Sequence, residues 1–278
     1  MRDINFDSIV NAVADLTKAC ARLTPSCTRA MRSALDKESN ENAKFALEML
    51  AENARVATER NLPVCQDTGM AVVFVKLGQD AHVVGGLLSD AINEGVRRGY
   101  KAGGYRASVL DPITRVNTRD NTPAVIHISA VSGDGIEFTF LPKGFGSENM
   151  SRLYMLTPSA GIEGVKNSII ESVKLAGSNP CPPIVIGVGI GGTAEKAMLL
   201  AKEQLLREIG APSADETLAQ LERELLADIN ALGIGAQGFG GDTTALAVHI
   251  GKYPTHISAL PVAVNIQCNA VRLASVRL

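Results

Sequence analysis

Apolar residues recur every three or four positions through much of residues 1–60. Phe6, Ile9 and Val13 follow this spacing, and so do Phe45 and Met49 further along. Because this is the period of an α-helix, the pattern predicts amphipathic helices throughout this part. Later helices are predicted at 86–100, 161–177, 193–208 and 215–232.

Short apolar runs bounded by glycine and proline begin at residue 70. The run 70–77 reads MAVVFVKL, and its β-branched residues predict a buried strand. The runs 123–130 and 135–141 are joined by Val-Ser-Gly-Asp-Gly, turn residues that predict a β-hairpin. Further strands are predicted at 182–190, 243–250 and 260–266.

The order of these elements predicts an α+β (mixed α/β) fold. A helical N-terminal part is followed by mixed sheets flanked by helices. Because the chain has no internal repeat, low-complexity tract or clear linker, a single domain is expected over residues 1–278.

Composition narrows the classes of function. The net charge is −2 and the pI is near 6.1, so neither nucleic acid nor a membrane is expected as a partner. The start of the chain has no basic segment followed by an apolar one, and no apolar stretch approaches bilayer length. We therefore expect a cytoplasmic protein that binds small molecules and other proteins.

The five cysteines do not resemble the disulfide framework of a secreted protein, and an odd number leaves one unpaired. Cys20 and Cys27 fall within or beside helical segments, where a small buried residue is expected. Cys65, Cys181 and Cys268 instead stand at junctions of strands and loops, from which a rigid scaffold can direct side chains into one site.

Spacing alone leaves the role of these three cysteines open. They lack a paired motif such as Cys-x-x-Cys, so unrelated buried thiols are one interpretation. A shared iron–sulfur cluster with one iron left open is another, because thiolate is the ligand that such clusters select. Zinc held by cysteines and His256 is a third, although histidine is scarce in this chain.

Several residues near these cysteines are candidates for substrate binding. Gln66 and Asp67 follow Cys65 and offer an amide and a carboxylate, although Asp-Thr-Gly is also a common turn. Arg106 can clamp a carboxylate with two hydrogen bonds, although many loop arginines are only solvated. The glycines around Gly144 and Gly146 can present backbone N–H groups to an anion or simply form a turn.

The run Gly187–Gly192 matches the spacing of a dinucleotide-binding loop, with a strand before it and a helix after it. That motif requires a second strand ending in an acidic residue. Here the polar segment 209–215 follows the helix instead, which argues against an oxidoreductase.

Six segments together resemble the α subunit of class I, iron–sulfur-dependent fumarate hydratase, and the resemblance spans nearly the whole chain. They are Pro63–Met70, Pro142–Ser151, Asn179–Pro183, Gly187–Thr193, Gln237–Leu246 and Tyr253–His256.

The resemblance implies that Cys65, Cys181 and Cys268 hold a [4Fe-4S] cluster whose open iron binds a small dicarboxylic acid. It further implies reversible hydration of fumarate to (S)-malate. Substrate-binding groups are then Gln66, Arg106 and the backbone of Gly144 and Gly146, with Asp67 and His256 close to the proton transfer.

Family members occur as one long chain or as two subunits, so the resemblance also implies a separate β subunit in a heterodimer or heterotetramer. Asn269 and Asp242 depart from the histidine after the cysteine and the basic residue after Gly-Gly that are common in fumarase-like chains. These departures keep L-tartrate and methyl-substituted diacids open as substrates. The alternative to an enzyme is a non-enzymatic role, in which the chain is a regulatory or sensor subunit that holds the cluster without turnover.

Overall fold

The structure is a computed structural model that describes residues 2–278, apart from the side chain of Cys20. It divides into two compact units. Unit 1 comprises the chain up to Leu23, Ala54–Phe145 and Arg272–Leu278, and unit 2 comprises Thr24–Asn53 and Gly146–Val271. The expected catalytic domain over residues 1–278 therefore contains two separately packed cores, and its status as one domain stays a prediction.

Unit 1 is built on a four-stranded mixed sheet in the order β10-β5-β2-β4. A short parallel pair, β1 with β3, lies outside this sheet. The elements of unit 1 are β1 (Arg2–Asn5), α1 (Phe6–Leu16), η1 (Thr17–Ala21), β2 (Met70–Gly78), β3 (Ala81–Val84), α4 (Leu88–Ala102), β4 (Val125–Val131), β5 (Ile136–Lys143) and β10 (Ala274–Arg277).

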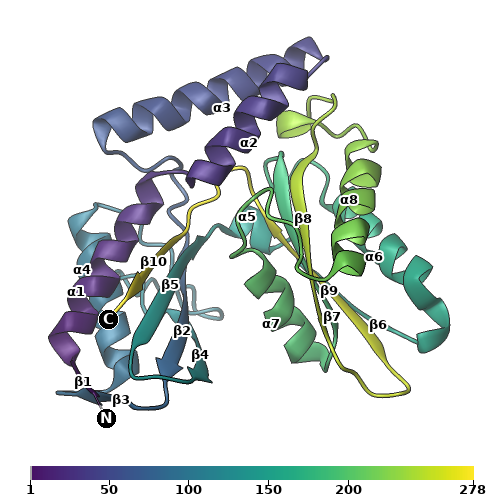
Figure 1. Cartoon of the computed structure of the whole chain (residues 1–278). Coiled ribbons are helices and arrows are strands. Elements are labelled where there is room, and N and C mark those ends of the chain that lie inside the picture. The colour runs from purple at the N-terminus through teal and green to yellow at the C-terminus, as the bar shows by residue number, and fades with distance from the viewer. Residues whose placement is uncertain (1) are drawn as a thin grey trace. The chain divides into compact units, whose positions relative to one another are not determined.

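Helices α1 and α4 lie side by side and cover one face of this sheet, as Figure 1 shows. Their buried apolar stripes, including Ile9 and Val13 on α1 and Val96 on α4, pack against inward residues of β2 and β5. Gly95 permits the close approach of the two helices, because a Cβ there would lie 2.7 Å from the Cβ of Val13. The expected helical pattern of residues 6–16 therefore serves the core of unit 1.

The predicted hairpin between β4 and β5 is wrong. β2 lies between these strands, parallel to β4 and antiparallel to β5. The turn between β4 and β5 bonds the end of β2 instead, since Gly78 N–H donates to Gly135 O and Gln79 N–H donates to Val131 O. β2 is apolar along most of its length, whereas β4 is mostly exposed. Burying β2 in the centre of the sheet therefore gains more hydrophobic free energy than pairing β4 directly with β5.

Unit 2 is built on a second four-stranded mixed sheet, in the order β6-β9-β7-β8. α3 passes from one unit to the other, because the boundary falls after Asn53. The remaining elements are α2 (Pro25–Lys37), α3 (Glu41–Arg60), α5 (Phe145–Glu148), β6 (Arg152–Leu156), η2 (Pro158–Ala160), α6 (Gly161–Ala176), β7 (Ile184–Gly191), α7 (Ala194–Gln204), α8 (Glu216–Asn230), η3 (Ala236–Gly238), β8 (Ala245–Tyr253) and β9 (Leu260–Gln267).

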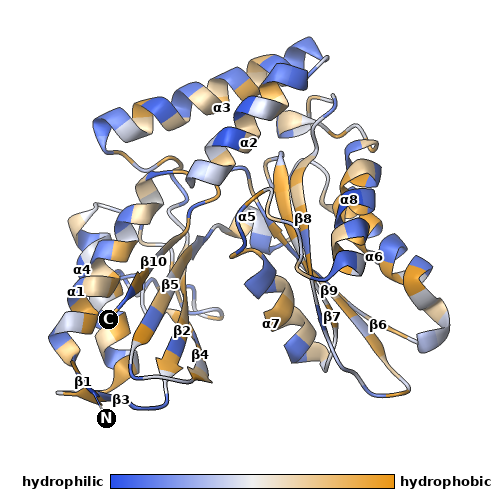
Figure 2. Ribbon diagram, in the orientation of Figure 1, coloured by the Kyte–Doolittle hydropathy of each residue, from blue (hydrophilic) through white to orange (hydrophobic). Residues whose placement is uncertain are grey.

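Helices α6 and α8 cover one face of this second sheet and α7 covers the other (Figure 1). Figure 2 shows that β7, β8 and β9 are largely apolar along their length, as expected for strands covered on both faces. Ile186 and Val264 belong to the core beneath α6 and α8, whereas Ala263 packs against α7.

The mixed α+β fold predicted from the sequence is confirmed. The helices near 161–177, 193–208 and 215–232 and the strands at 70–77, 182–190, 243–250 and 260–266 all form, with small shifts in their ends. The short strands β1, β3, β6 and β10 were not predicted. No helix in the described part of the chain is long and apolar enough to cross a membrane.

Candidate functional site

Cys65 lies in unit 1, in the turn that leads from α3 into β2, and its side chain is exposed. The turn closes locally, because Asp67 Oδ1 accepts a hydrogen bond of 2.9 Å from Gly69 N–H. Gly69 has a φ of +83°, and a Cβ there would lie 2.6 Å from the carbonyl carbon of Pro142. Only glycine fits this position, so the backbone after the cysteine follows one path.

The second carboxylate oxygen of Asp67 reaches the loop after β5. Phe145 N–H donates to Asp67 Oδ2 at 3.0 Å, and a Cβ on Gly144 would lie 3.2 Å from the same oxygen. The anion bound by this part of the glycine loop is thus the carboxylate of Asp67 itself. Gln66 is exposed, so its amide is open to a ligand, whereas Gly144 is buried and Gly146 is exposed.

Two fully buried cationic side chains support the turn at Asp67 and the adjacent loop at Gly144. The sequence analysis did not identify this role. Arg272 Nη1 donates to Asp67 O at 3.0 Å, and Lys143 Nζ donates to Gly144 O at 3.3 Å. Each residue is 1% exposed. Tyr100 Oη adds a third bond, donating to Gly69 O at 3.0 Å. The available signal was a charged residue within an apolar segment, because Arg272 follows Ala270-Val271.

Cys181 and Cys268 lie in unit 2 at the same end of its sheet. Cys181 precedes β7 and Cys268 follows β9, and these antiparallel strands pair Val185 with Gln267. Cys181 is exposed and Cys268 is half-buried. The predicted position of both cysteines at strand–loop junctions is confirmed, and the fold brings these junctions together.

Asn269, the residue after Cys268, joins the two junctions directly. Its backbone N–H donates to Cys181 O at 3.2 Å, and its Nδ2 donates to the same oxygen at 2.8 Å. Gln267, on the other side of Cys268, places Nε2 at 3.8 Å from the cysteine Sγ. Amide N–H groups near a sulfur stabilise its thiolate form and tune a metal bound to it.

Cys27 is buried in α2, as predicted, and its Sγ donates to Asn269 O at 3.3 Å. Burial raises the pKa of this thiol to about 12, and nearby Cys268 adds to the rise. Cys27 therefore remains a protonated thiol and is a poor metal ligand. The corresponding prediction for Cys20 lies outside the described side chains.

The loop Ala236–Gly238 holds the residue that follows Cys181. Gln237 N–H and Gln237 Nε2 both donate to Pro182 O, each at 2.8 Å.

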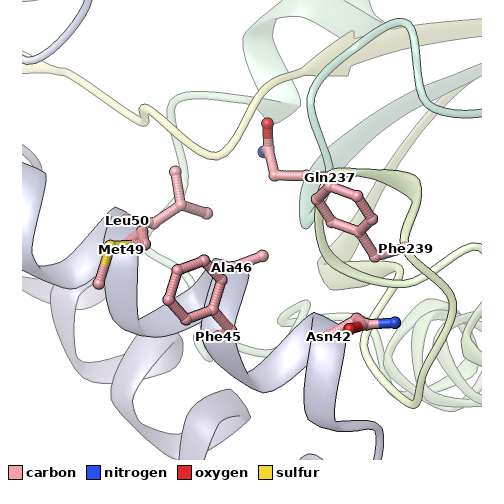
Figure 3. Close-up of a pocket in the computed structure, with 7 residues that line it drawn as sticks. All are labelled: Asn42, Phe45, Ala46, Met49, Leu50, Gln237 and Phe239. Carbon is pink, nitrogen blue, oxygen red and sulfur yellow. The ribbon is translucent and has the colours of Figure 1, made fainter.

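Gln237 also borders an apolar pocket of about 480 Å³, whose other lining residues come from α3 and this loop (Figure 3). They are Asn42, Phe45, Ala46, Met49, Leu50 and Phe239.

Asp242, which departs from the fumarase-like pattern, makes a structural contact in unit 2. Its Oδ2 accepts a hydrogen bond of 2.8 Å from Ser39 N–H, and its own N–H donates to the carboxylate of Glu38. The loop before β8 is thereby tied to the junction of α2 and α3.

The segment after Gly146 is anchored on the α7 side of the second sheet. Glu148 pairs with Lys202 of α7, and Asn265 Nδ2 donates to Glu148 Oε2 at 3.1 Å and to Ser151 Oγ at 2.9 Å. These contacts give Glu148 and Ser151 a structural role that does not require them to touch a ligand.

His256 lies in the loop between β8 and β9, as predicted, but at the other end of the sheet from Cys181. β8 ends with Tyr253 paired to Gly191 at the far end of β7, a strand about 23 Å long at ~3.3 Å per residue. The imidazole is exposed, and its Nδ1 lies 2.8 Å from Ser258 Oγ. Within unit 2, therefore, the fold does not bring His256 to the cysteine end.

Arg106 lies in the loop after α4 in unit 1 and is exposed. The structure thus keeps Cys65, Gln66, Asp67, Arg106 and Gly144 in unit 1 and the other predicted site residues in unit 2.

The glycines of Gly187–Gly192 have a packing role. A Cβ on Gly187 would lie 2.1 Å from Ala201 O, and one on Gly189 would lie 2.1 Å from Ala197 O. These glycines therefore let α7 pack directly on β7. This accounts for the motif without a dinucleotide.

The donor set suits an iron–sulfur cluster. Cys65 and Cys181 are exposed, and Cys268 is half-buried. Asp67 closes the turn after Cys65, and Asn269 ties the segment of Cys268 to the carbonyl oxygen of Cys181. In the described residues, neither unit by itself gathers three Cys, His, Asp or Glu side chains that could hold a metal ion.

The comparison with known families defines a hydro-lyase, an enzyme that breaks a carbon–oxygen bond by elimination of water. The family model for fumarate hydratase (Fumerase) matches residues 10–277, and the chain belongs to this family. The resemblance inferred from the sequence is thereby confirmed.

Similar proteins differ in the substrate that they are named for. The "Putative L(+)-tartrate dehydratase subunit alpha" of Methanocaldococcus jannaschii is 44% identical over 277 residues, covering 97% of each chain. An L(+)-tartrate dehydratase subunit alpha of Escherichia coli is 31% identical, covering 98% of this chain and 91% of that one. The anaerobic class I fumarate hydratase of Escherichia coli is 35% identical, covering 85% of this chain and 45% of that protein.

Proposed function

We propose that this chain is the α subunit of a two-subunit hydro-lyase that interconverts fumarate and (S)-malate. The observation that carries the proposal is the junction of Cys181 and Cys268, tied by Asn269 at one end of a sheet in a chain of the fumarate hydratase family. Cys65, in the other unit, is the third proposed ligand of a [4Fe-4S] cluster.

When bound, such a cluster supplies an open iron that acts as a Lewis acid toward the hydroxyl group that leaves. The chain's own residues then bind the diacid and move the proton. The exposed Gln66 amide and Arg106 guanidinium are suited to the substrate carboxylates, and the backbone of Gly144 and Gly146 is proposed to complete this binding.

Asp67 is the proposed proton acceptor at the carbon next to the leaving group. Backbone N–H groups of Gly69 and Phe145 fix both carboxylate oxygens, so the carboxylate is held in one orientation beside the Cys65 turn. His256 remains a second candidate for proton transfer. Its place at the opposite end of the sheet from Cys181 supports Asp67 as the stronger one.

L-tartrate is the second candidate substrate, and methyl-substituted diacids are a third. Tartrate is favoured by the names of the similar proteins from Methanocaldococcus jannaschii and Escherichia coli that this chain matches over nearly its whole length. (S)-Malate and L-tartrate are both four-carbon diacids with a hydroxyl beside a carboxylate. The same binding groups therefore serve either substrate.

A separate β subunit is part of the proposal. The similar tartrate dehydratase chains of Methanocaldococcus jannaschii and Escherichia coli are named as α subunits. The β subunit would supply further groups that bind the diacid.

The cytoplasmic location of the protein stays a prediction.

The test is anaerobic co-expression with a β partner, followed by iron and sulfide analysis and assays with malate, fumarate and L-tartrate. Cys65→Ser, Cys181→Ser and Cys268→Ser should each lose iron and turnover. Cys27→Ala, which removes a buried thiol outside the ligand set, should keep both. Full activity of an iron-free enzyme, or of the α chain alone, would contradict the proposal.

A further inference from the structure

Two amide residues hold the backbone at Cys181 in the same manner. Asn269 directs its backbone N–H and its side-chain Nδ2 to Cys181 O, at 3.2 and 2.8 Å. Gln237 directs its backbone N–H and its side-chain Nε2 to Pro182 O, at 2.8 Å each. Two consecutive carbonyl oxygens therefore each accept two hydrogen bonds from one amide residue.

The backbone that these bonds hold is otherwise unfavourable. Cys181 has a φ of +54° and Gln237 a φ of +53°, in the left-handed region that residues with a Cβ rarely adopt. Such conformations persist where the surrounding structure fixes them. The four bonds from Asn269 and Gln237 do so here, together with the bond of 3.0 Å from Cys181 N–H to Ser178 O.

Asn269 also connects this backbone to the neighbouring cysteine. It follows Cys268 directly, so the donors that fix Cys181 lie on the segment that carries the second thiol. Its carbonyl oxygen is fixed in turn by the Cys27 thiol at 3.3 Å and by Val271 N–H at 3.0 Å. Asn269 therefore ties the two thiol-bearing segments to each other, through its backbone N–H and its side-chain amide.

We propose that Asn269 and Gln237 form an amide clamp that sets the position of the Cys181 thiol, and with it the retention of a bound cluster. These are positioning residues, since they act through Cys181. The proposal rests on the proposed function, in which Cys181 is a cluster ligand. A ligand held in advance loses less conformational freedom on binding metal, so loosening the clamp should speed cluster loss.

The test uses the complete enzyme, with the α and β chains together and the cluster reconstituted anaerobically. Asn269→Ala and Gln237→Ala remove the side-chain donors, and Asn269→Asp keeps the shape while removing the N–H donor. The matched control is Asn179→Ala, which removes an amide two residues before Cys181 whose Nδ2 contacts Met150 Sδ instead.

Two measurements test the clamp, and the melting temperature checks that each variant folds. The first is the half-life of the cluster's visible absorbance in excess iron chelator, and the second is amide hydrogen exchange over residues 178–184 of the cluster-free protein. The clamp variants should lose the cluster about fivefold faster, as expected for one lost hydrogen bond, and should exchange faster over 178–184. Asn179→Ala should match the unsubstituted enzyme in both. The melting temperature should stay within a few degrees for all variants.

Cluster lifetimes equal to that of the unsubstituted enzyme in all three clamp variants would overturn the clamp. Failure of the proposed function is distinguishable, because the unsubstituted enzyme would then hold no cluster. In that case the clamp is judged by exchange alone, and unchanged exchange over 178–184 in the variants overturns it.

Discussion

Arg272 donates a hydrogen bond of 3.0 Å from Nη1 to the backbone oxygen of Asp67, which is 205 positions earlier in the chain. The guanidinium is 1% exposed, so this bond is made without water. Arg272→Met should lower the free energy of unfolding by about 2 kcal/mol, because a charged hydrogen bond is lost and a buried carbonyl loses a donor. A urea titration followed by circular dichroism measures the change.

Arg272→Lys is the matched variant, because it keeps the charge but not the planar group with its several donors. It should recover only part of the lost stability. If both variants unfold at the urea concentration of the unsubstituted protein, Arg272 does not hold the Asp67 turn.

Gly144→Ala tests the contact between the glycine loop and Asp67. The added methyl would lie 3.2 Å from Asp67 Oδ2, so the carboxylate must shift by a few tenths of an ångström. If Asp67 is the proton acceptor, kcat should fall about tenfold or more, since small displacements of a catalytic group are costly. In the Gly146→Ala variant, the added methyl group would contact only Asn179 O, at 3.5 Å. This variant should therefore have an unchanged melting temperature. An unchanged kcat in Gly144→Ala would argue against Asp67.

Most of the fold followed from the periodicity of the sequence, and the errors have a common cause. Long amphipathic helices such as 161–177 and compact apolar strands such as 70–77 carry their pattern locally. The pairing of β4 with β2 instead of β5 depends on which strand gains most from the centre of the sheet, which no local turn signal records. The four-residue strands, such as β10, are too short for a periodic signal.

The site was predictable where a residue type carries its own chemistry. Three cysteines at strand–loop junctions could be selected from five on that ground. The positioning residues could not be selected in this way; they are Asn269, Gln237 and Arg272. An amide or a guanidinium acts as a positioning group only through the distant carbonyl oxygen to which it donates. The distance of His256 from Cys181 likewise follows from strand direction, which the sequence alone does not give.

Cys27 should resist alkylation while Cys65 and Cys181 react. Burial raises the pKa of Cys27 to about 12, so almost none of its thiol is ionised at pH 8, whereas the other two side chains are exposed. Site-resolved mass spectrometry of cluster-free protein treated briefly with iodoacetamide measures the three rates. Labelling of Cys27 as fast as Cys65 would show that α2 does not bury this thiol.

Asp67→Asn should reduce turnover more than His256→Ala does. The amide keeps the shape of the carboxylate but cannot accept the proton, so kcat should fall by about 100-fold or more. His256 is exposed at the far end of the sheet, and its loss should have the smaller effect. Steady-state assays with malate measure both. A larger loss of kcat in His256→Ala would reverse the assignment of the base.

His249 should make unit 2 less stable in mild acid. It lies on β8 and is 2% exposed, with Nδ1 3.1 Å from Gln204 O. Burial, helped by the nearby Arg207, lowers its pKa to about 4 from an ordinary value of 6.5. Between these values the unfolded chain binds a proton that the folded chain does not, so stability falls as pH falls through this range. The loss from pH 7 to pH 5 should be about 2 kcal/mol. Urea titrations at both pH values measure it, and His249→Gln, which does not titrate, should lose correspondingly less. An equal loss in both proteins would assign the acid sensitivity to other groups.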